Sequence, residues 1–224
     1  MTPACASLRA ADHGPALRVA EQFEEASQQR AAATLGMWIF LATEVMFFGA
    51  LFFAYWIARY QFPAAFAAAS RHTNIVLGTT NTAVLLTSSL FMALAVKCAE
   101  EDLRRATVTL LAITGLLGLA FMGIKLTEYA LDYRDHLVPA VNFAFDPAYA
   151  RGALVFFGRY FLTTGLHLVH LSVGIALVAL FAWRVARRRP NALADQVDIV
   201  GLYWHFVDIV WIFLYPCLYL VSRT

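Results

Sequence analysis

Three ionisable side chains lie deep inside long apolar stretches of the sequence, where each needs a chemical reason to be present. Glu44 lies about 13 residues into one stretch, roughly 20 Å deep by helix rise, and His167 and His170 lie near the middle of another. A charged side chain at the bilayer centre costs at least about 2.5–3.5 kcal/mol, so such groups are paired, neutral or close to water. Glu44, His167 and His170 are therefore the candidates for a proton-responsive polar cluster inside the membrane.

The two histidines also suggest a ligand pair for a metal or a haem. His167 and His170 are spaced i and i+3, so a helix brings both to one face. A complete site needs further ligands, and the one other histidine in an apolar stretch is His205. The remaining histidines lie in polar segments: His13, His72 and His136. The residues thus predict no metal site, with a haem bound by His170 and His205 as the minor alternative.

Two further polar pairs have structural interpretations. His205 and Asp208 are spaced i and i+3, and we expect a satisfied hydrogen-bond pair between helices. Lys125 and Glu128 have the same spacing near the outer end of an apolar stretch. We expect Lys125 to extend to the membrane interface, where Glu128 neutralises it.

Membrane-spanning helices are the elements that must position these residues. Only 14% of the 224 residues are charged, against about 25% in soluble domains. The apolar stretches are continuous rather than alternating, which favours helices over a barrel. About 20 apolar residues span a bilayer, and the stretches that reach this length are residues 31–60, 75–96, 106–130, 153–183 and 200–221. The sequence therefore predicts an all-α integral membrane protein, with a polar cytoplasmic tail over residues 1–30 and a five-helix transmembrane bundle over residues 31–224.

The basic residues predict the orientation of this bundle. Ten lie on the side of the N-terminal tail: Arg9, Arg18, Arg30, Lys97, Arg104, Arg105, Arg184, Arg187, Arg188 and Arg189. Five lie on the opposite side: Arg59, Arg71, Arg134, Arg151 and Arg223. The positive-inside rule therefore places the N-terminus in the cytoplasm and the C-terminus in the periplasm of a bacterial inner membrane.

Small and hydroxylic residues follow the second stretch in place of charges. Gly78, Thr82 and Ser89 fall on one helical stripe, and Asn81 and Ser88 on another. Such residues let helix backbones approach closely and hydrogen-bond across the interface. This pattern predicts tight helix packing rather than the continuous polar lining of a channel.

Composition excludes several other classes of protein. The three cysteines, Cys5, Cys98 and Cys217, form no CxxC pair, so neither a zinc ribbon nor a dithiol is predicted. A net charge of +2 gives no basic surface for nucleic acid. Residues 1–30 hold no apolar core of a cleavable signal peptide.

Three segments of the chain resemble subunit III of the haem–copper respiratory oxidases, the cytochrome c oxidase subunit III family. The first stretch reads LGMWIFLATEVMFFGALFFAY, similar to the family's SEVMFF segment. The fourth reads RYFLTTGLHLVHLSVG, similar to TGFHGLHVxxG, and the fifth reads GLYWHFVDIVWIFLYPCLYL, similar to YWHFVDVVWLFLY. The IKLTEY segment of the third stretch agrees, so the resemblance covers about residues 31–222.

The resemblance implies a supporting subunit of a proton-pumping terminal oxidase that reduces oxygen to water. Family members carry no redox centre, so haems and copper are expected in partner subunits I and II, with subunit I in direct contact. They bind phospholipid and support stability and sustained proton uptake by the catalytic subunit. Mitochondrial-type members have seven spans, whereas five-span bacterial members exist.

Several alternatives stay open at the level of sequence. The five-span members include subunits of quinol oxidases, so cytochrome c is the expected donor and quinol the alternative. A close relative accompanies bacterial nitric oxide reductase. Outside the family, a stand-alone membrane transporter or a b-type cytochrome remains.

The positions of Glu44 and the two histidines lead to one geometric hypothesis. The first and fourth stretches are each about 30 residues long and cross the bilayer in opposite directions. Glu44, His167 and His170 therefore lie near the same depth. We expect Glu44 within hydrogen-bond reach of His167 or His170, directly or through one water.

Overall fold

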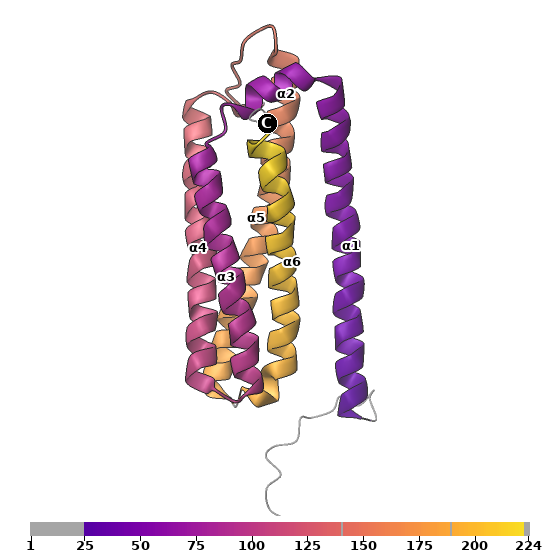
Figure 1. Cartoon of the computed structure of the whole chain (residues 1–224), viewed down its shortest axis with the longest axis vertical. Coiled ribbons are helices and arrows are strands. Elements are labelled where there is room, and N and C mark those ends of the chain that lie inside the picture. The colour runs from indigo at the N-terminus through magenta and orange to yellow at the C-terminus, as the bar shows by residue number, and fades with distance from the viewer. Residues whose placement is uncertain (1–24, 140, 189, 222–224) are drawn as a thin grey trace, which may run out of the picture.

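Helices joined by loops make up the part of the chain that the structure describes, and no strand occurs in it. The computed structural model describes residues 25–139, 141–188 and 190–221. Its elements are α1 (Ala26–Gln61), α2 (Pro63–Ser70), α3 (Ile75–Glu100), α4 (Arg104–Arg134), α5 (Ala150–Arg187), the 3₁₀ turn η1 (Asn191–Leu193) and α6 (Ala194–Tyr219). Five of them are long and apolar enough to cross a membrane (Figure 1). The predicted all-α, five-span architecture is confirmed.

The helices extend past most of the predicted spans, and one helix was not predicted. Helices α1 and α5 have 36 and 38 residues, longer than about 20 residues need, so they tilt or protrude from the bilayer. The segment between the first two spans forms α2 because Pro63 occupies its first turn, where proline is tolerated, and an alanine-rich run follows. Its Phe66 and Ala69 are fully buried, so α2 packs across the end of the bundle.

Helix α6 forms the centre of the bundle, and α1 stands at its side. In the most apolar window of α6, 61% of residues are buried, against 11% in α1. Figure 1 shows α3, α4, α5 and α6 grouped together, with α1 beside them and connected to α3 through α2 at one end. Leu41 and Phe48 form part of the one face that α1 packs against the bundle.

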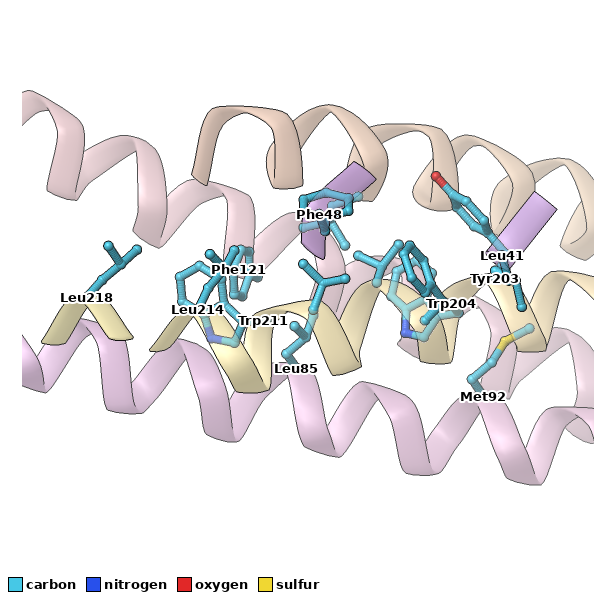
Figure 2. Packing of buried hydrophobic residues seen from close by; sticks show 14 of the residues in the cluster. Leu41, Phe48, Leu85, Met92, Phe121, Tyr203, Trp204, Trp211, Leu214 and Leu218 are labelled. Carbon is cyan, nitrogen blue, oxygen red and sulfur yellow. The ribbon is translucent and has the colours of Figure 1, made fainter. Parts of the chain in front are cut away.

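Close packing of α3 on α6 confirms the interpretation of the second span. A side chain at Gly78 would meet the ring of Tyr219 at 2.9 Å. The α3 hydroxyls accept hydrogen bonds from buried indoles, Trp211 Nε1 to Thr82 Oγ1 at 3.1 Å and Trp204 Nε1 to Ser88 Oγ at 3.2 Å. Figure 2 shows both indoles in the cluster of buried apolar residues between the helices.

Candidate functional site

Glu44 on α1 contacts His170 on α5, as the sequence predicts for one of the two histidines. Glu44 Oε2 lies 3.1 Å from His170 Nε2, and each side chain is 18% exposed. Leu41 and Phe48 lie about one turn to either side of Glu44 and are buried. The Phe48 ring also meets the His170 ring edge-on at 5.2 Å. The pair therefore lies in the seam where α1 meets the bundle, between apolar side chains that limit the access of water.

Backbone contacts fix the orientation of the His170 ring. Nδ1 lies 2.8 Å from the carbonyl oxygen of Leu166, and a carbonyl can only accept, so Nδ1 carries a hydrogen. Tyr203 on α6 donates to the His170 carbonyl at 2.9 Å. A hydrogen bond between Nε2 and Glu44 then requires a proton on one of these two groups. Either the carboxyl O–H donates to Nε2 or an imidazolium donates to the carboxylate.

His167 does not join this pair, so the predicted three-residue cluster is wrong in that part. It is fully buried, with its ring 5.6 Å from that of Phe121 and 5.2 Å from that of Trp211. Neither ring nitrogen has a hydrogen-bond partner among the described residues. Residues i and i+3 differ by about 60° around a helix. On α5, which packs against both α1 and α4, that angle is enough to direct His170 to the seam and His167 to the core.

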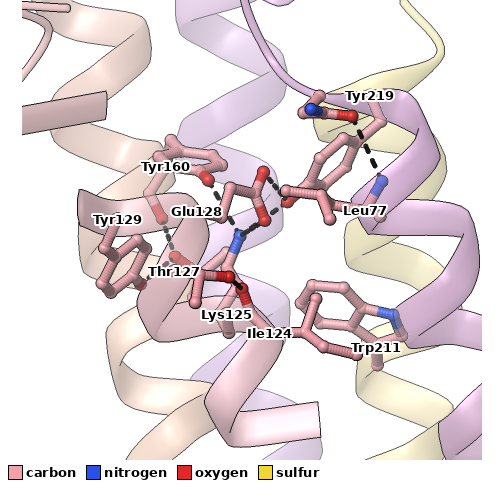
Figure 3. Close-up of polar contacts among 12 residues, drawn as sticks. Leu77, Ile124, Lys125, Thr127, Glu128, Tyr129, Tyr160, Trp211 and Tyr219 are labelled. Carbon is pink, nitrogen blue, oxygen red and sulfur yellow. Dashed lines mark hydrogen bonds and ion pairs between the residues drawn. The ribbon is translucent and has the colours of Figure 1, made fainter. Parts of the chain in front are cut away.

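Lys125 and Glu128 are paired, but inside the bundle rather than at the interface. Lys125 Nζ lies 3.0 Å from Glu128 Oε2, and the two side chains are 0% and 2% exposed. The expected extension of Lys125 to the membrane surface is therefore wrong. Its three N–H donors are all used, because Nζ also lies 2.8 Å from the Tyr160 hydroxyl and 2.6 Å from the Tyr219 hydroxyl. Tyr219 in turn donates to Glu128 Oε1 at 2.7 Å (Figure 3).

This closed network explains why a lysine stays in the core. A buried ion pair is tolerated only when further hydrogen bonds satisfy both charges, and here the two tyrosines satisfy them. Aromatic rings around Nζ contribute as well, since its distance to the ring centroid of Tyr160 is 4.5 Å. The network therefore joins α4, α5 and α6.

His205 and Asp208 do not form the satisfied pair that their spacing predicts. His205 Nδ1 lies 2.8 Å from Ser89 Oγ on α3, so His205 does join two helices. Asp208 is 3% exposed, and neither carboxyl oxygen has a hydrogen-bond partner among the described residues. The interhelical role is therefore confirmed for His205 alone.

Further polar contacts tie α1 to the bundle near its two ends. Arg30 Nε lies 2.6 Å from Asp195 Oδ2 at the beginning of α6. Near the opposite end, the Tyr55 hydroxyl donates to the Cys217 carbonyl. With Glu44–His170 between them, polar contacts secure α1 along its length. In the described ranges, no group of three or more histidine, cysteine, aspartate or glutamate side chains is positioned to hold a metal ion.

Comparison with known proteins identifies the family. The family model described as cytochrome c oxidase subunit III matches residues 24–223. The chain belongs to this family. The resemblance carried by its three sequence segments is thereby confirmed, and the chain is subunit III of a haem–copper oxidase.

Curated relatives of similar length carry a related name. A probable quinol oxidase subunit 3 of Staphylococcus haemolyticus is 28% identical over 191 residues, 85% of this chain and 89% of the relative. The Staphylococcus saprophyticus protein of the same name is 28% identical over 206 residues, 92% and 96% of the two chains. The same name belongs to a Staphylococcus aureus protein that is 27% identical over 191 residues.

The sequence did not indicate that Tyr160 and Tyr219 belong to the buried Lys125–Glu128 network. Tyr219 lies near the end of the fifth span, where tyrosines commonly face the membrane interface, yet it is fully buried. One signal could have placed it: Asp208, Trp211, Tyr215 and Tyr219 follow helical spacing along the face of α6 that begins with the WHFVD segment. Tyr160 directly follows an arginine, and this charged neighbour gives no sign in the sequence that the Tyr160 side chain points into the core.

Proposed function

We propose that the chain is a supporting subunit without a redox centre, in an oxidase whose haems and copper lie in partner subunits I and II. The Glu44–His170 contact is the observation that supports this proposal. Deep in the membrane, this contact joins α1 to the bundle and does not line an open site. By holding α1 against the bundle, the pair would maintain the surface that subunit I contacts. The stability and sustained proton uptake of the catalytic subunit would depend on that surface.

The Glu44–His170 pair gives this role a proton-responsive part. With one proton between Nε2 and the carboxyl group, the pair is neutral overall. A second proton would leave a neutral carboxyl beside an imidazolium, and loss of the shared proton would leave an unpaired carboxylate. Both changes leave a net charge in the seam and weaken the attachment of α1.

Glu44→Gln tests the role of this pair. Glutamine keeps the size and one hydrogen bond but cannot share a proton, so we expect unchanged haem content in the oxidase, weaker retention of the chain and a shorter period of steady turnover. Thr43→Val is the matched control, since the exposed Thr43 hydroxyl donates to the Phe40 carbonyl within its own helix. A Glu44→Gln oxidase that retains the chain and its turnover like the control would contradict the proposal.

Quinol is the electron donor that the comparisons favour for the complex. The curated relatives that match most of this chain are named as probable quinol oxidase subunits. Cytochrome c is the donor in the family's own description. The two assignments differ in whether the purified complex oxidises a quinol or reduced cytochrome c.

A bound phospholipid is proposed where α1 and α6 begin. A cavity of about 120 Å³ lies there, lined by Arg30 and Thr34 on α1 and by Asp195 and Asp198 on α6. Because Arg30 is paired with Asp195 and two carboxylates line the cavity, a zwitterionic headgroup suits it, with the phosphate near Arg30 and the amine near the aspartates. The apolar side chains of α1 above the cavity suit acyl chains. The site lies at the end of the bundle that the basic residues assign to the cytoplasm.

The proposed orientation in the bacterial inner membrane has a direct test. The ten-to-five asymmetry of basic residues, taken with five spanning helices, supports a C-terminus on the periplasmic side. We expect alkaline phosphatase fused after Thr224 to be active and a cytoplasmic reporter fused there to be silent. The opposite pattern would overturn the orientation.

A further inference from the structure

A stripe of titratable side chains runs along the face of α6 that packs on α3. Asp198, His205 and Asp208 are spaced by seven and three residues, so they lie along one side of the helix, with about 10 Å and then about 4.5 Å between successive levels. His205 contacts Ser89 on α3 at 2.8 Å. The stripe begins where α6 begins and ends in the core.

Asp208 is the innermost member of this stripe. It is 3% exposed, and neither carboxyl oxygen has a hydrogen-bond donor among the described residues. An ionised carboxylate without a donor costs several kcal/mol in an apolar interior. Asp208 therefore holds a proton in this arrangement.

The polar neighbours of Asp208 form a series that runs toward the end of the bundle where α6 begins. Ser89 lies close to its carboxyl, outside hydrogen-bond geometry, and also bonds to His205. His205 interacts electrostatically with Asp198. The charged groups around Asp198 are Asp195 on α6 and Lys97 and Glu100 at the end of α3. Lys97 and Glu100 are exposed and form an ion pair, so the series reaches the aqueous surface there.

We propose that Asp208 is a proton-binding site that exchanges with the aqueous phase through Ser89, His205 and Asp198. On release, the Asp208 proton passes by way of the Ser89 hydroxyl to the neutral His205 ring, and the imidazolium passes it to water, which carries it across the remaining distance to Asp198. Uptake is the reverse, and no oxidant or other reactant is needed. The Lys125–Glu128 network lies toward the opposite end of the bundle and takes no part.

Infrared spectroscopy of the full chain in lipid nanodiscs tests this site without the oxidase complex, so it is independent of the function proposed above. The spectrum of the native chain minus that of Asp208→Asn should contain the carbonyl band of a protonated carboxyl group. On transfer to D2O the band should shift as the proton exchanges. His205→Phe should keep the carbonyl band but lower the rate of its shift in D2O by on the order of a hundredfold. This is the size of effect that a positioned proton donor provides.

A second variant and a matched control complete the infrared test. Ser89→Ala removes one hydroxyl and should also slow the shift, which covers the case that His205→Phe fails to fold. Ser172→Ala is the matched control, since the exposed Ser172 hydroxyl donates to the Leu168 carbonyl of its own helix, and it should leave the rate unchanged. The absence of the protonated band would overturn the proposal. So would a rate unaltered by the folded His205 and Ser89 variants.

Discussion

Lys125→Met is expected to lower the free energy of unfolding of the chain by about 3–5 kcal/mol, the cost of leaving one member of a buried ion pair alone. Methionine fills a similar volume, so the loss comes from charge and hydrogen bonds rather than from a cavity. Glu128 would keep only the Tyr219 hydroxyl as a donor, and Tyr160 would lose the Nζ contact. Reversible unfolding of the purified chain in mixed micelles measures the change.

A double variant distinguishes the ion pair from simple packing. Lys125→Met combined with Glu128→Gln removes both charges and leaves neutral groups near the two tyrosines. We expect this double variant to be more stable than Lys125→Met alone, because no uncompensated charge remains. A loss below about 1 kcal/mol for Lys125→Met, within the range of exposed ion pairs, would contradict the buried network.

Gly152→Ala is expected to destabilise the junction of α2 and α5 by about 1–3 kcal/mol, as overpacking of a tight contact does. The added Cβ would lie 2.4 Å from the Cβ of Ala65 and 3.0 Å from that of Phe62. Both are the first atoms of their side chains and cannot rotate away, so α2 itself must move. Thermal unfolding in detergent measures the effect.

Gly158 provides the matched control on the same helix. A Cβ at Gly158 meets no atom within 4 Å, and alanine is favoured over glycine in a helix by up to about 1 kcal/mol. Gly158→Ala should therefore be neutral or stabilising. Equal midpoints for the two variants would show that α2 does not pack tightly on α5.

The sequence was sufficient for those features that depend on one helix or on membrane depth. Continuous apolar stretches predicted five spans because a bilayer imposes their length, and equal depth predicted the contact of Glu44 with a histidine. The i,i+3 spacing predicted the pairing of Lys125 with Glu128. None of these inferences needs the arrangement of the other helices.

Features that depend on that arrangement could not be predicted. Which of His167 and His170 contacts Glu44 depends on the rotation of α5 between its neighbours. Lys125 lies in the core rather than at the interface because Tyr160 and Tyr219, far away in sequence, surround it. Helix α2 was missed because it is too short for a span, and its burial comes from α5 rather than from its own pattern.

Isolation of the native oxidase through an affinity tag after Thr224 tests the central claim most directly. We predict that the chain, extracted from membranes in mild detergent, brings with it a larger haem-containing subunit, and that the complex reduces oxygen with quinol as donor. Removal of the chain should leave the haem content of the remainder unchanged and shorten its steady turnover. A chain that is always isolated without a haem-containing partner, or that holds stoichiometric haem by itself, would contradict the account.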